Sequence, residues 1–380
     1  MLVGREAQQA VVENSARLVE AGRAPQHVIL TGLRGVGKTV LLKDVARRLR
    51  ERDWLCGYYE VRRNVEVGVT ISTIVAEGVS LLPRKTQLRA ALRAVRHSIG
   101  SATLSGAPDG TVSLQVSARS GAASEDPYLA ILGLFRALSR AAAGDHAGVA
   151  LCIDEVQLFR RRDAATLIQT LQAADGTADS RVLMLAAGLP MTPVELAKAS
   201  TYAERFRYER LDDLGDRDAR LAIEQAALAE AVRWSEDALA AVVVLARGYP
   251  FFLQLYASES WDVAAARAGE LTEITLADVR AAEPRVTRRL DTGLYSSRYA
   301  RLSTGERAYL LAMAKLMRKD ESPVRSGATA RSLGKALSEP SPVRERLIAK
   351  GLIYAPGHGE LAFTVPGFRG YLLRRGAEGD

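Results

Sequence analysis

The eight residues Gly32–Thr39 constrain the fold of this chain more than any other feature. They match the pattern G-x-x-x-x-G-K-[ST] at every fixed position. An apolar, β-rich run over Val28–Thr31 precedes them, and a helical pattern over Val40–Arg52 follows. A strand, a glycine-rich turn and a helix in this order open an α/β unit. The alternative is a chance glycine-rich turn, but the flanking strand and helix favour a phosphate-binding loop.

Each residue type in this loop has a separate expected task. Glycines let the backbone wrap around phosphate oxygens with its N–H groups pointing inward, and the following helix turns its positive end toward them. We expect Lys38 to reach the β- and γ-phosphates and the Thr39 hydroxyl to ligate Mg²⁺. ATP or ADP with Mg²⁺ are therefore the predicted cofactors. The residues predicted to bind the nucleotide here are Gly32, Leu33, Arg34, Gly35, Val36, Gly37, Lys38, Thr39 and Val40.

Two acidic residues follow a second apolar run, Gly148–Ile153. Ligands of parallel α/β sheets bind at the carboxyl ends of the strands, where Asp154 and Glu155 would lie. We expect Asp154 to bind Mg²⁺, directly or through water, and Glu155 to polarise the attacking water. An Asp-Glu pair after a strand can also cap a helix. Together with the phosphate loop, however, the pair predicts an ATPase.

Strand and helix patterns alternate through the first 210 residues. Further strands are expected at Cys56–Val61, Val149–Ile153 and Arg181–Ala187. Alternation of this kind predicts a parallel sheet covered by helices on both faces. The separating helical patterns are Ile71–Leu82, Tyr128–Ala142 and Ala164–Ala173.

Residues 85–125 interrupt this alternation and are interpreted as an insertion in the core. A helical pattern over Arg84–Arg96 is followed by a hairpin, Ser101–Leu104 with Val112–Ser117, and by a Gly/Ala/Ser-rich linker. The helix places three arginines on one face, which could contact DNA or a protein partner, or could be a solvated surface. These arginines are Arg89, Arg93 and Arg96.

The net charge of +8 belongs to the C-terminal quarter of the chain. Residues 285–380 hold 18 Lys and Arg against 9 Asp and Glu, whereas the preceding residues hold 34 against 35. A basic segment on a near-neutral body indicates a polyanion partner or a solubilising surface.

Cys56 and Cys152 are expected to be buried free thiols. No apolar run approaches the roughly 20 residues of a membrane span and no secretory signal opens the chain, so we expect a cytoplasmic protein.

Two further modules are expected after the core. Helical patterns fill residues 211–292 and predict a small all-helical domain. Residues 293–380 instead show three helices followed by two short strands. The helices are expected at Thr304–Leu316, Thr329–Leu337 and Pro342–Lys350, and the strands at Leu352–Tyr354 and Glu360–Thr364.

These motifs, in this order, resemble AAA+ ATPases of the origin-recognition/initiator type and the related STAND class. Gly32–Thr39 and Leu151–Glu155 are similar to the Walker A and Walker B motifs. The opening Val3–Glu6 is similar to the box that lies near the adenine in these proteins. The resemblance implies an α/β P-loop NTPase core with a parallel sheet, a helical lid domain and a C-terminal winged helix-turn-helix domain. It adds Val3, Gly4 and Arg5 to the expected nucleotide-binding residues.

The resemblance also implies roles for residues around the γ-phosphate. Where the family often has a polar sensor residue, Ala187 and Gly188 offer none, so Thr192 would have to substitute. Arg205 is the candidate arginine finger acting on a neighbouring subunit, which implies a homo-oligomer. Arg207 and Arg210 are competing candidates, and a surface salt bridge with Glu204 or Glu209 is the alternative. Gly248 and Pro250 are similar to the G-x-P motif of the STAND lid, whose proline packs against the nucleotide, or they simply start a helix.

The winged-helix resemblance implies double-stranded DNA as a partner, with the third helix in a groove. Three functions stay open. The first is an ATP-dependent switch coupled to DNA binding. The second is a STAND-type signalling ATPase whose winged helix docks a protein, and the third is an ATP-dependent regulator of a mobile-element or transposition system. The candidate DNA contacts are Arg344, Arg346, Lys350 and His358.

Overall fold

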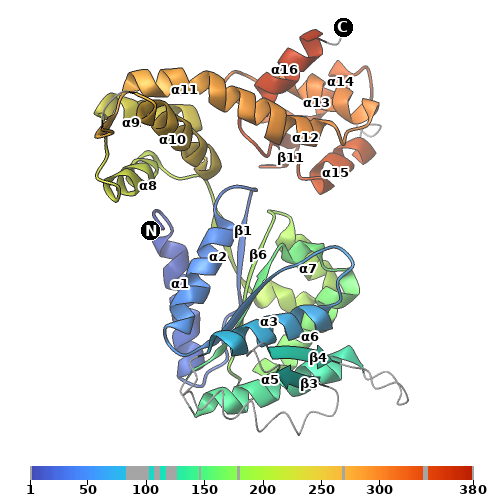
Figure 1. The fold of residues 1–380 in the computed structure, drawn as a ribbon. Helices are drawn as coiled ribbons and strands as arrows, with labels where there is room; N and C mark the ends of the chain where they lie inside the picture. The colour runs from blue at the N-terminus through green and yellow to red at the C-terminus, as the bar shows by residue number, and fades with distance from the viewer. Residues whose placement is uncertain are drawn as a thin grey trace.

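The protein consists of an α/β body with two smaller groups of elements above the carboxyl ends of its strands (Figure 1). Within the described residues, no helix is both long enough and apolar enough to cross a bilayer. The computed structural model describes residues 2–82, 102–106, 112–116, 126–144, 147–177, 180–267, 270–336 and 341–378.

A five-stranded sheet with all neighbours parallel forms the centre of the body. Its spatial order is β2-β5-β6-β1-β7, so β1 lies between two strands that come much later in the chain. The four expected strands and their parallel pairing are confirmed, and β7 is an additional edge strand. The bounds are β1 Val28–Gly32, β2 Leu55–Glu60, β5 Val149–Asp154, β6 Val182–Gly188 and β7 Arg207–Leu211.

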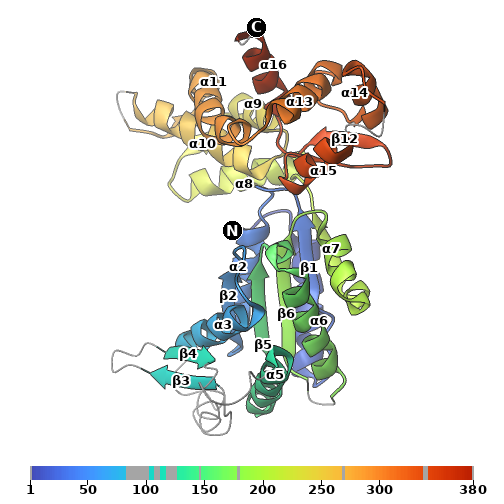
Figure 2. The same ribbon diagram turned by 90° about the vertical axis from the view of Figure 1, so that its right-hand side faces the viewer.

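Successive strand residues point to opposite faces of this sheet and build two separate apolar layers. Leu30 and Cys152 belong to the layer shared with α1 and α2, whereas Ile29 and Ile153 belong to the layer shared with α3, α5 and α6. Both faces are therefore covered by helices, as expected (Figure 2). The bounds are α1 Glu6–Glu20, α2 Lys38–Arg50, α3 Val67–Leu81, α5 Pro127–Ala143, α6 Arg161–Asp175 and α7 Thr192–Ala199.

The expected hairpin within residues 85–125 is present. Its strands, β3 (Ala102–Gly106) and β4 (Val112–Val116), pair antiparallel and lie beside α3 and α5 at the amino-terminal end of the sheet (Figure 2). The expected arginine face at Arg89, Arg93 and Arg96 and the linker over 117–124 lie outside the described residues.

A helical group follows β7 and packs above α1 and α2 (Figure 1). Two very short parallel strands, β8 (Arg233–Trp234) and β9 (Glu273–Ile274), join its helices. Its last helix continues without a break through a π-helical segment, η3 (Leu290–Tyr295), into α12 (Ser296–Tyr299). The other helices of this group are α8 Asp216–Leu228, α9 Glu236–Ala246, α10 Pro250–Ala265 and α11 Leu276–Arg289.

The last module combines four helices with a three-stranded antiparallel sheet of order β10-β12-β11. The three expected helices and two expected strands are present within a few residues of their expected ends, and β10 and α16 were not expected. A capping box between Ser303 and Glu306 starts its first helix. The bounds are α13 Thr304–Leu316, β10 Val324–Arg325, α14 Ser326–Ser332, α15 Ser341–Ala349, β11 Ile353–Tyr354, β12 Glu360–Phe363 and α16 Phe368–Glu378.

The two cysteines lie on the neighbouring strands β2 and β5. Both are buried and unbridged, with their sulfur atoms 3.5 Å apart, which confirms the expected free thiols.

Candidate nucleotide-binding site

The loop Gly32–Thr39 joins the carboxyl end of β1 to the first turn of α2. Gly35 and Gly37 have φ angles of 85° and 96°, which lie in the left-handed region that favours glycine. A side chain at Gly35 would also clash with the hydroxyl of Tyr249 from the helical group. The loop thus has the conformation that its glycine spacing predicts, and the helical group approaches it closely.

Lys38 is the first residue of α2, and its side chain folds back into the loop. Its Nζ donates to the carbonyl oxygens of Gly32 at 2.9 Å and Leu33 at 2.7 Å, and the residue is 6% exposed. Burial lowers the pKa of the Lys38 ammonium to about 8, although the charges of Glu155 and Asp154 act in the opposite direction. A desolvated cation at the start of a helix is well placed to bind an anion.

This lowered pKa predicts that nucleotide affinity depends on pH. Above pH 8 the free protein would hold Lys38 largely neutral, whereas bound phosphates would raise its pKa and hold it protonated, so binding would take up a proton. We expect affinity for Mg-ATP to fall roughly tenfold between pH 7 and pH 9. Calorimetry in buffers of different ionisation heat should show uptake of about one proton at pH 9 and little at pH 7. An affinity that does not change over this range would contradict the prediction.

Asp154, the last residue of β5, lies against the loop. Its Oδ2 accepts hydrogen bonds from the Thr39 hydroxyl at 2.5 Å and the Tyr58 hydroxyl at 3.0 Å. Its Oδ1 accepts from the backbone N–H of Glu155 at 2.8 Å. The structure therefore brings together the two oxygen groups that the sequence assigned to magnesium, and it adds Tyr58 on the neighbouring strand β2.

Glu155 has an unusual backbone conformation, with φ 52° and ψ 37°. A residue other than glycine held in this left-handed region costs about 1–3 kcal/mol, and such strain is concentrated at functional sites. Its carboxylate accepts a hydrogen bond of 2.6 Å from the amide Nε2 of Gln157 and lies 3.9 Å from the guanidinium of Arg34. The carboxylate therefore lies between Gln157 and the side chain of Arg34, a residue of the phosphate loop.

Gln157 links this acid to the end of β6. Its Oε1 accepts from the backbone N–H of Leu189 at 3.2 Å. A side chain at Gly188 would clash with the Thr192 hydroxyl and approach Oε1 of Gln157, so these groups share one small region. The Thr192 hydroxyl is buried, and among the described residues it has no hydrogen-bond partner. Gly188 itself is the last residue of β6 and pairs with Thr31 of β1.

The opening box lies where the core meets the helical group. Arg5 is buried, and its guanidinium donates to the carbonyl oxygens of Val36 at 2.9 Å and Asp212 at 2.7 Å. Burial lowers the pKa of this guanidinium. Gly4 faces Asp218 in the first turn of α8, where a side chain would not fit. Arg5 thus connects the phosphate loop to the residues after β7 through hydrogen bonds.

The residues that precede α10 contact the other side of the loop. The Tyr249 hydroxyl donates to the carbonyl oxygen of Arg34. Gly248 has a φ of 71°, and its carbonyl oxygen accepts from the backbone N–H of Leu214 at 2.8 Å. Pro250 is the first residue of α10. The Gly-Tyr-Pro sequence therefore starts a helix and also lies on the phosphate loop.

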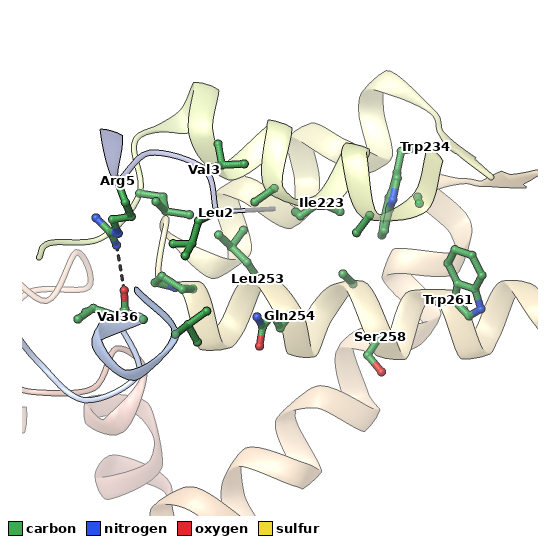
Figure 3. A pocket seen from close by; sticks show the side chains of 18 of the residues that line it. Leu2, Val3, Arg5, Val36, Ile223, Trp234, Leu253, Gln254, Ser258 and Trp261 are labelled. Atoms are coloured by element: carbon green, nitrogen blue, oxygen red, sulfur yellow. Dashed lines mark hydrogen bonds between the residues drawn. The ribbon is translucent and has the colours of Figure 1, made fainter. Parts of the chain in front are cut away.

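An elongated cavity of about 550 Å³ lies between the loop, the opening box and the helical group (Figure 3). Its walls are mainly apolar, with α8 on one side and α10 on the other. Trp234 and Trp261 line its far end. Val3, Arg5 and Val36 line its near end (Figure 3). The lining includes further residues that the sequence assigned to the nucleotide, namely Gly37, Val40 and Pro250.

Arg205 does not join this site within one chain. It lies just before β7, and Arg207 at the start of β7 pairs with Val28 at the start of β1, so Arg205 is at the amino-terminal end of the sheet. The phosphate loop is at the opposite end, about 17 Å along the strands. The guanidinium is exposed and stacks over the Tyr202 ring at 5.3 Å.

The four candidate DNA contacts differ in their surroundings. The Lys350 ammonium donates to both oxygens of the buried Glu306, at 2.8 Å and 2.7 Å, and Arg346 lies 3.7 Å from the same carboxylate. Burial raises the pKa of the Glu306 carboxyl, but the hydrogen bonds from Lys350 and Ser303 outweigh it and lower the pKa overall. Arg344 is half-buried on the same helix, and His358 is exposed between β11 and β12. Lys350 therefore helps to hold α15 against α13.

Three side chains that touch this site were not predicted from the sequence: Tyr58, Gln157 and Tyr249. The contact of Gln157 could have been suspected from its position two residues after Glu155. Tyr249 stood inside the Gly-Tyr-Pro sequence already singled out. Tyr58 could have been found only from the pairing of β2 with β5, in which Glu60 lies opposite Asp154.

Two known protein families match separate parts of the chain. Residues 1–185 match the family described as AAA ATPase domain. Residues 292–372 match a family described as a domain of unknown function (DUF8462). No curated protein matches the chain.

Solved structures match nearly the whole chain at low identity. The Walker-type ATPase PABY2304 of Pyrococcus abyssi is 14% identical with a TM-score of 0.60, covering 98% of this chain and 96% of that one. A RuvB mutant of Thermotoga maritima is 17% identical with a TM-score of 0.50, covering 95% and 93%. The Aeropyrum pernix Orc1 protein in complex with DNA is 16% identical with a TM-score of 0.47, covering 100% and 93%. The parallel five-stranded sheet, the loop after β1 and the family match at residues 1–185 together identify a P-loop AAA+ fold.

Proposed function

We propose that the protein binds Mg-ATP in the loop Gly32–Thr39 and hydrolyses it. The observation that carries this proposal is the 2.5 Å contact between the Thr39 hydroxyl and Asp154, with Lys38 and Glu155 beside it. The experiment is ATP turnover by the purified chain with and without Mg²⁺. Absence of both binding and turnover would refute the proposal.

The residues present fit a magnesium ion. Thr39 and Asp154 offer hard oxygen ligands, which Mg²⁺ prefers, and the structure holds them side by side. Among the described residues no cluster of three or more His, Cys, Asp or Glu could hold a metal alone. Mg²⁺ would therefore take its remaining ligands from phosphate oxygens and water, and it would neutralise charge on the phosphates.

Residues of the chain itself bind the phosphates, orient the attacking water and position the catalytic acid. Lys38 and the loop N–H groups bind the phosphates, and Glu155 orients the attacking water. Gln157 holds the Glu155 carboxylate, so it acts as a positioning residue. The adenine and ribose would lie in the near end of the cavity, between Val3, Val40 and Pro250. Arg205 would act only on the site of another copy, which requires assembly of the ATP-bound protein.

We further propose that nucleotide state controls binding of double-stranded DNA by the last module. This proposal is supported by the order α13, β10, α14, α15, β11, β12, which resembles that of a winged helix, and by the basic charge of residues 285–380, which favours a polyanion partner. A specific observation favours the second candidate, a STAND-type switch that docks a protein. Two of the candidate DNA contacts, Arg346 and Lys350, lie against Glu306.

Substitution of Arg344 by Glu separates these candidates. If the module binds DNA through α15, we expect the dissociation constant for a duplex to rise about tenfold, and the dependence of affinity on salt to weaken. His358→Glu should have a smaller effect in the same direction. Lys350 is unsuitable for this test, because Lys350→Glu would place two carboxylates together at Glu306.

The measurement is a duplex titration at several salt concentrations, with and without ATP. Lys198→Glu is the matched control, because it reverses an exposed charge on α7 of the body. Unchanged duplex affinity in Arg344→Glu and His358→Glu would favour the protein-docking candidate.

A further inference from the structure

The cavity between α8 and α10 extends beyond the place proposed for the nucleotide. Its lining on α10 begins at Pro250, the first residue of that helix, and reaches Trp261, which is about 16 Å further along the helix at 1.5 Å per residue. The adenine and ribose would occupy only the near end of this length, where Val3 and Val36 lie (Figure 3). The far end is therefore space that the proposed function does not use.

Small side chains keep the middle of this cavity open. The helix α8 contributes Ala222 and Ala226 to the walls, and α10 contributes Ala257 and Ser258. Residues three or four positions apart share one face of a helix, so each helix lines the cavity with a single face. The whole cavity, of about 550 Å³, has a volume in the usual range of ligand pockets.

Two tryptophans lie at the far end of the cavity (Figure 3). Trp234 belongs to β8 and Trp261 to α10, and both are half-buried. They pack against the same small apolar cluster, which consists of Ala227, Val232, Ala264 and Ile274. Indole rings beside a cavity offer a large apolar area and a negative π face, and this face attracts cations.

The charges of the lining differ between the two ends. Its one acidic residue is Glu230, in the turn that leads from α8 to Trp234. Within the part of the chain that the structure describes, the Glu230 carboxylate makes no ion pair. The other charged residue of the lining, Arg5, lies at the near end and already donates to two carbonyl oxygens. Aromatic rings and an unpaired carboxylate together suit an organic cation.

We propose that the far end of the cavity binds a small organic cation, an amine or quaternary ammonium group carried on an apolar body. The cationic group lies against the Trp234 and Trp261 rings, near the Glu230 carboxylate. The apolar body lies along the alanines of α8 and α10. A neutral apolar molecule would bury the same area but would leave the Glu230 charge unmatched. The site goes beyond the proposed ATPase function and does not depend on it.

The first test titrates benzyltrimethylammonium into the full chain without nucleotide, followed by tryptophan fluorescence and calorimetry. The chain has three tryptophans, and the third, Trp54, is fully buried in the body. A saturable change in fluorescence therefore reports on Trp234 and Trp261. Choline and its uncharged carbon isostere, 3,3-dimethylbutan-1-ol, test the charge, and we expect choline to bind about tenfold more tightly. Absence of saturable binding, or equal affinity for the two isosteres, would overturn the proposal.

Variants assign the binding to this end of the cavity. In Trp261→Leu we expect the dissociation constant for benzyltrimethylammonium to rise about tenfold, and Trp234→Leu provides a second variant if the first disturbs folding. Glu230→Gln should raise it about threefold, because this carboxylate is exposed. Glu224→Gln is the matched control, since Glu224 is on α8 but outside the cavity lining. Wild-type affinity in both tryptophan variants would refute the site.

Saturating Mg-ADP distinguishes this site from that of the nucleotide. Affinity for benzyltrimethylammonium should change less than about threefold, because the adenosine would fill only the near end. Complete displacement of the cation by Mg-ADP would show one shared site and contradict the proposal. If the chain does not bind Mg-ADP, the proposed ATP-binding function fails, whereas the titration without nucleotide still decides whether the cation site exists.

Discussion

Replacing Glu155 by Gln is expected to lower the rate of ATP hydrolysis by a factor of about 10²–10⁴, the usual contribution of general-base catalysis. Glutamine keeps the size of the side chain but cannot accept a proton from water. The loop contacts of Lys38 and Thr39 do not involve this carboxylate, so nucleotide affinity should change less than about threefold. The measurement is turnover under saturating Mg-ATP, beside a direct binding titration.

Glu60→Gln is the matched control for this variant. Glu60 is a carboxylate at the end of the neighbouring strand β2, opposite Asp154, and it is exposed. The Glu60→Gln variant should hydrolyse ATP at the wild-type rate. Wild-type turnover in Glu155→Gln would show that another group orients the water, and the nearest acidic candidate would then be Asp154.

Replacing Lys38 by Ala is expected to weaken Mg-ATP binding by roughly 30- to 100-fold, which corresponds to about 2–3 kcal/mol for a lost charge-assisted interaction. The lysine is a buried cation whose ammonium folds into the loop and donates to the Gly32 and Leu33 carbonyl oxygens. Titration with a fluorescent nucleotide would measure the loss, and circular dichroism would show whether the fold is retained.

Arg48→Ala provides the comparison, because Arg48 is a cation on the same helix that pairs with Asp44 on the surface. Its removal should leave nucleotide affinity unchanged. Equal affinity in Lys38→Ala and the wild-type chain would place the nucleotide elsewhere and remove the basis for the proposed function.

The phosphate loop and the acidic pair could be predicted because each is contiguous in sequence and follows a strong apolar strand. Tyr58 and Tyr249 could not, because their contacts with Asp154 and Arg34 depend on strand pairing and on how α10 sits. The strand β7 escaped prediction for a related reason. As an edge strand it buries mainly Leu211, so Arg207–Leu211 lacks a clear alternation of apolar and polar residues.

The assignment of Lys350 to DNA shows another limit of sequence patterns. Basic residues on a helix look alike whether they face solvent or a partner within the fold. The acid that binds Lys350 is 44 residues earlier, at the start of α13, and only the packed module brings the two together. The charge balance of residues 285–380 therefore overstates how many cations are available to an external polyanion.

The unbroken helix from Leu276 to Tyr299 has a mechanical consequence. At 1.5 Å per residue, its residues span about 36 Å, so a tilt of ten degrees at one end would displace the other by about 6 Å. A small rocking of α10 against the phosphate loop would thus be amplified at α12. Pro284 and the π-helical segment Leu290–Tyr295 are the places where such a lever would bend.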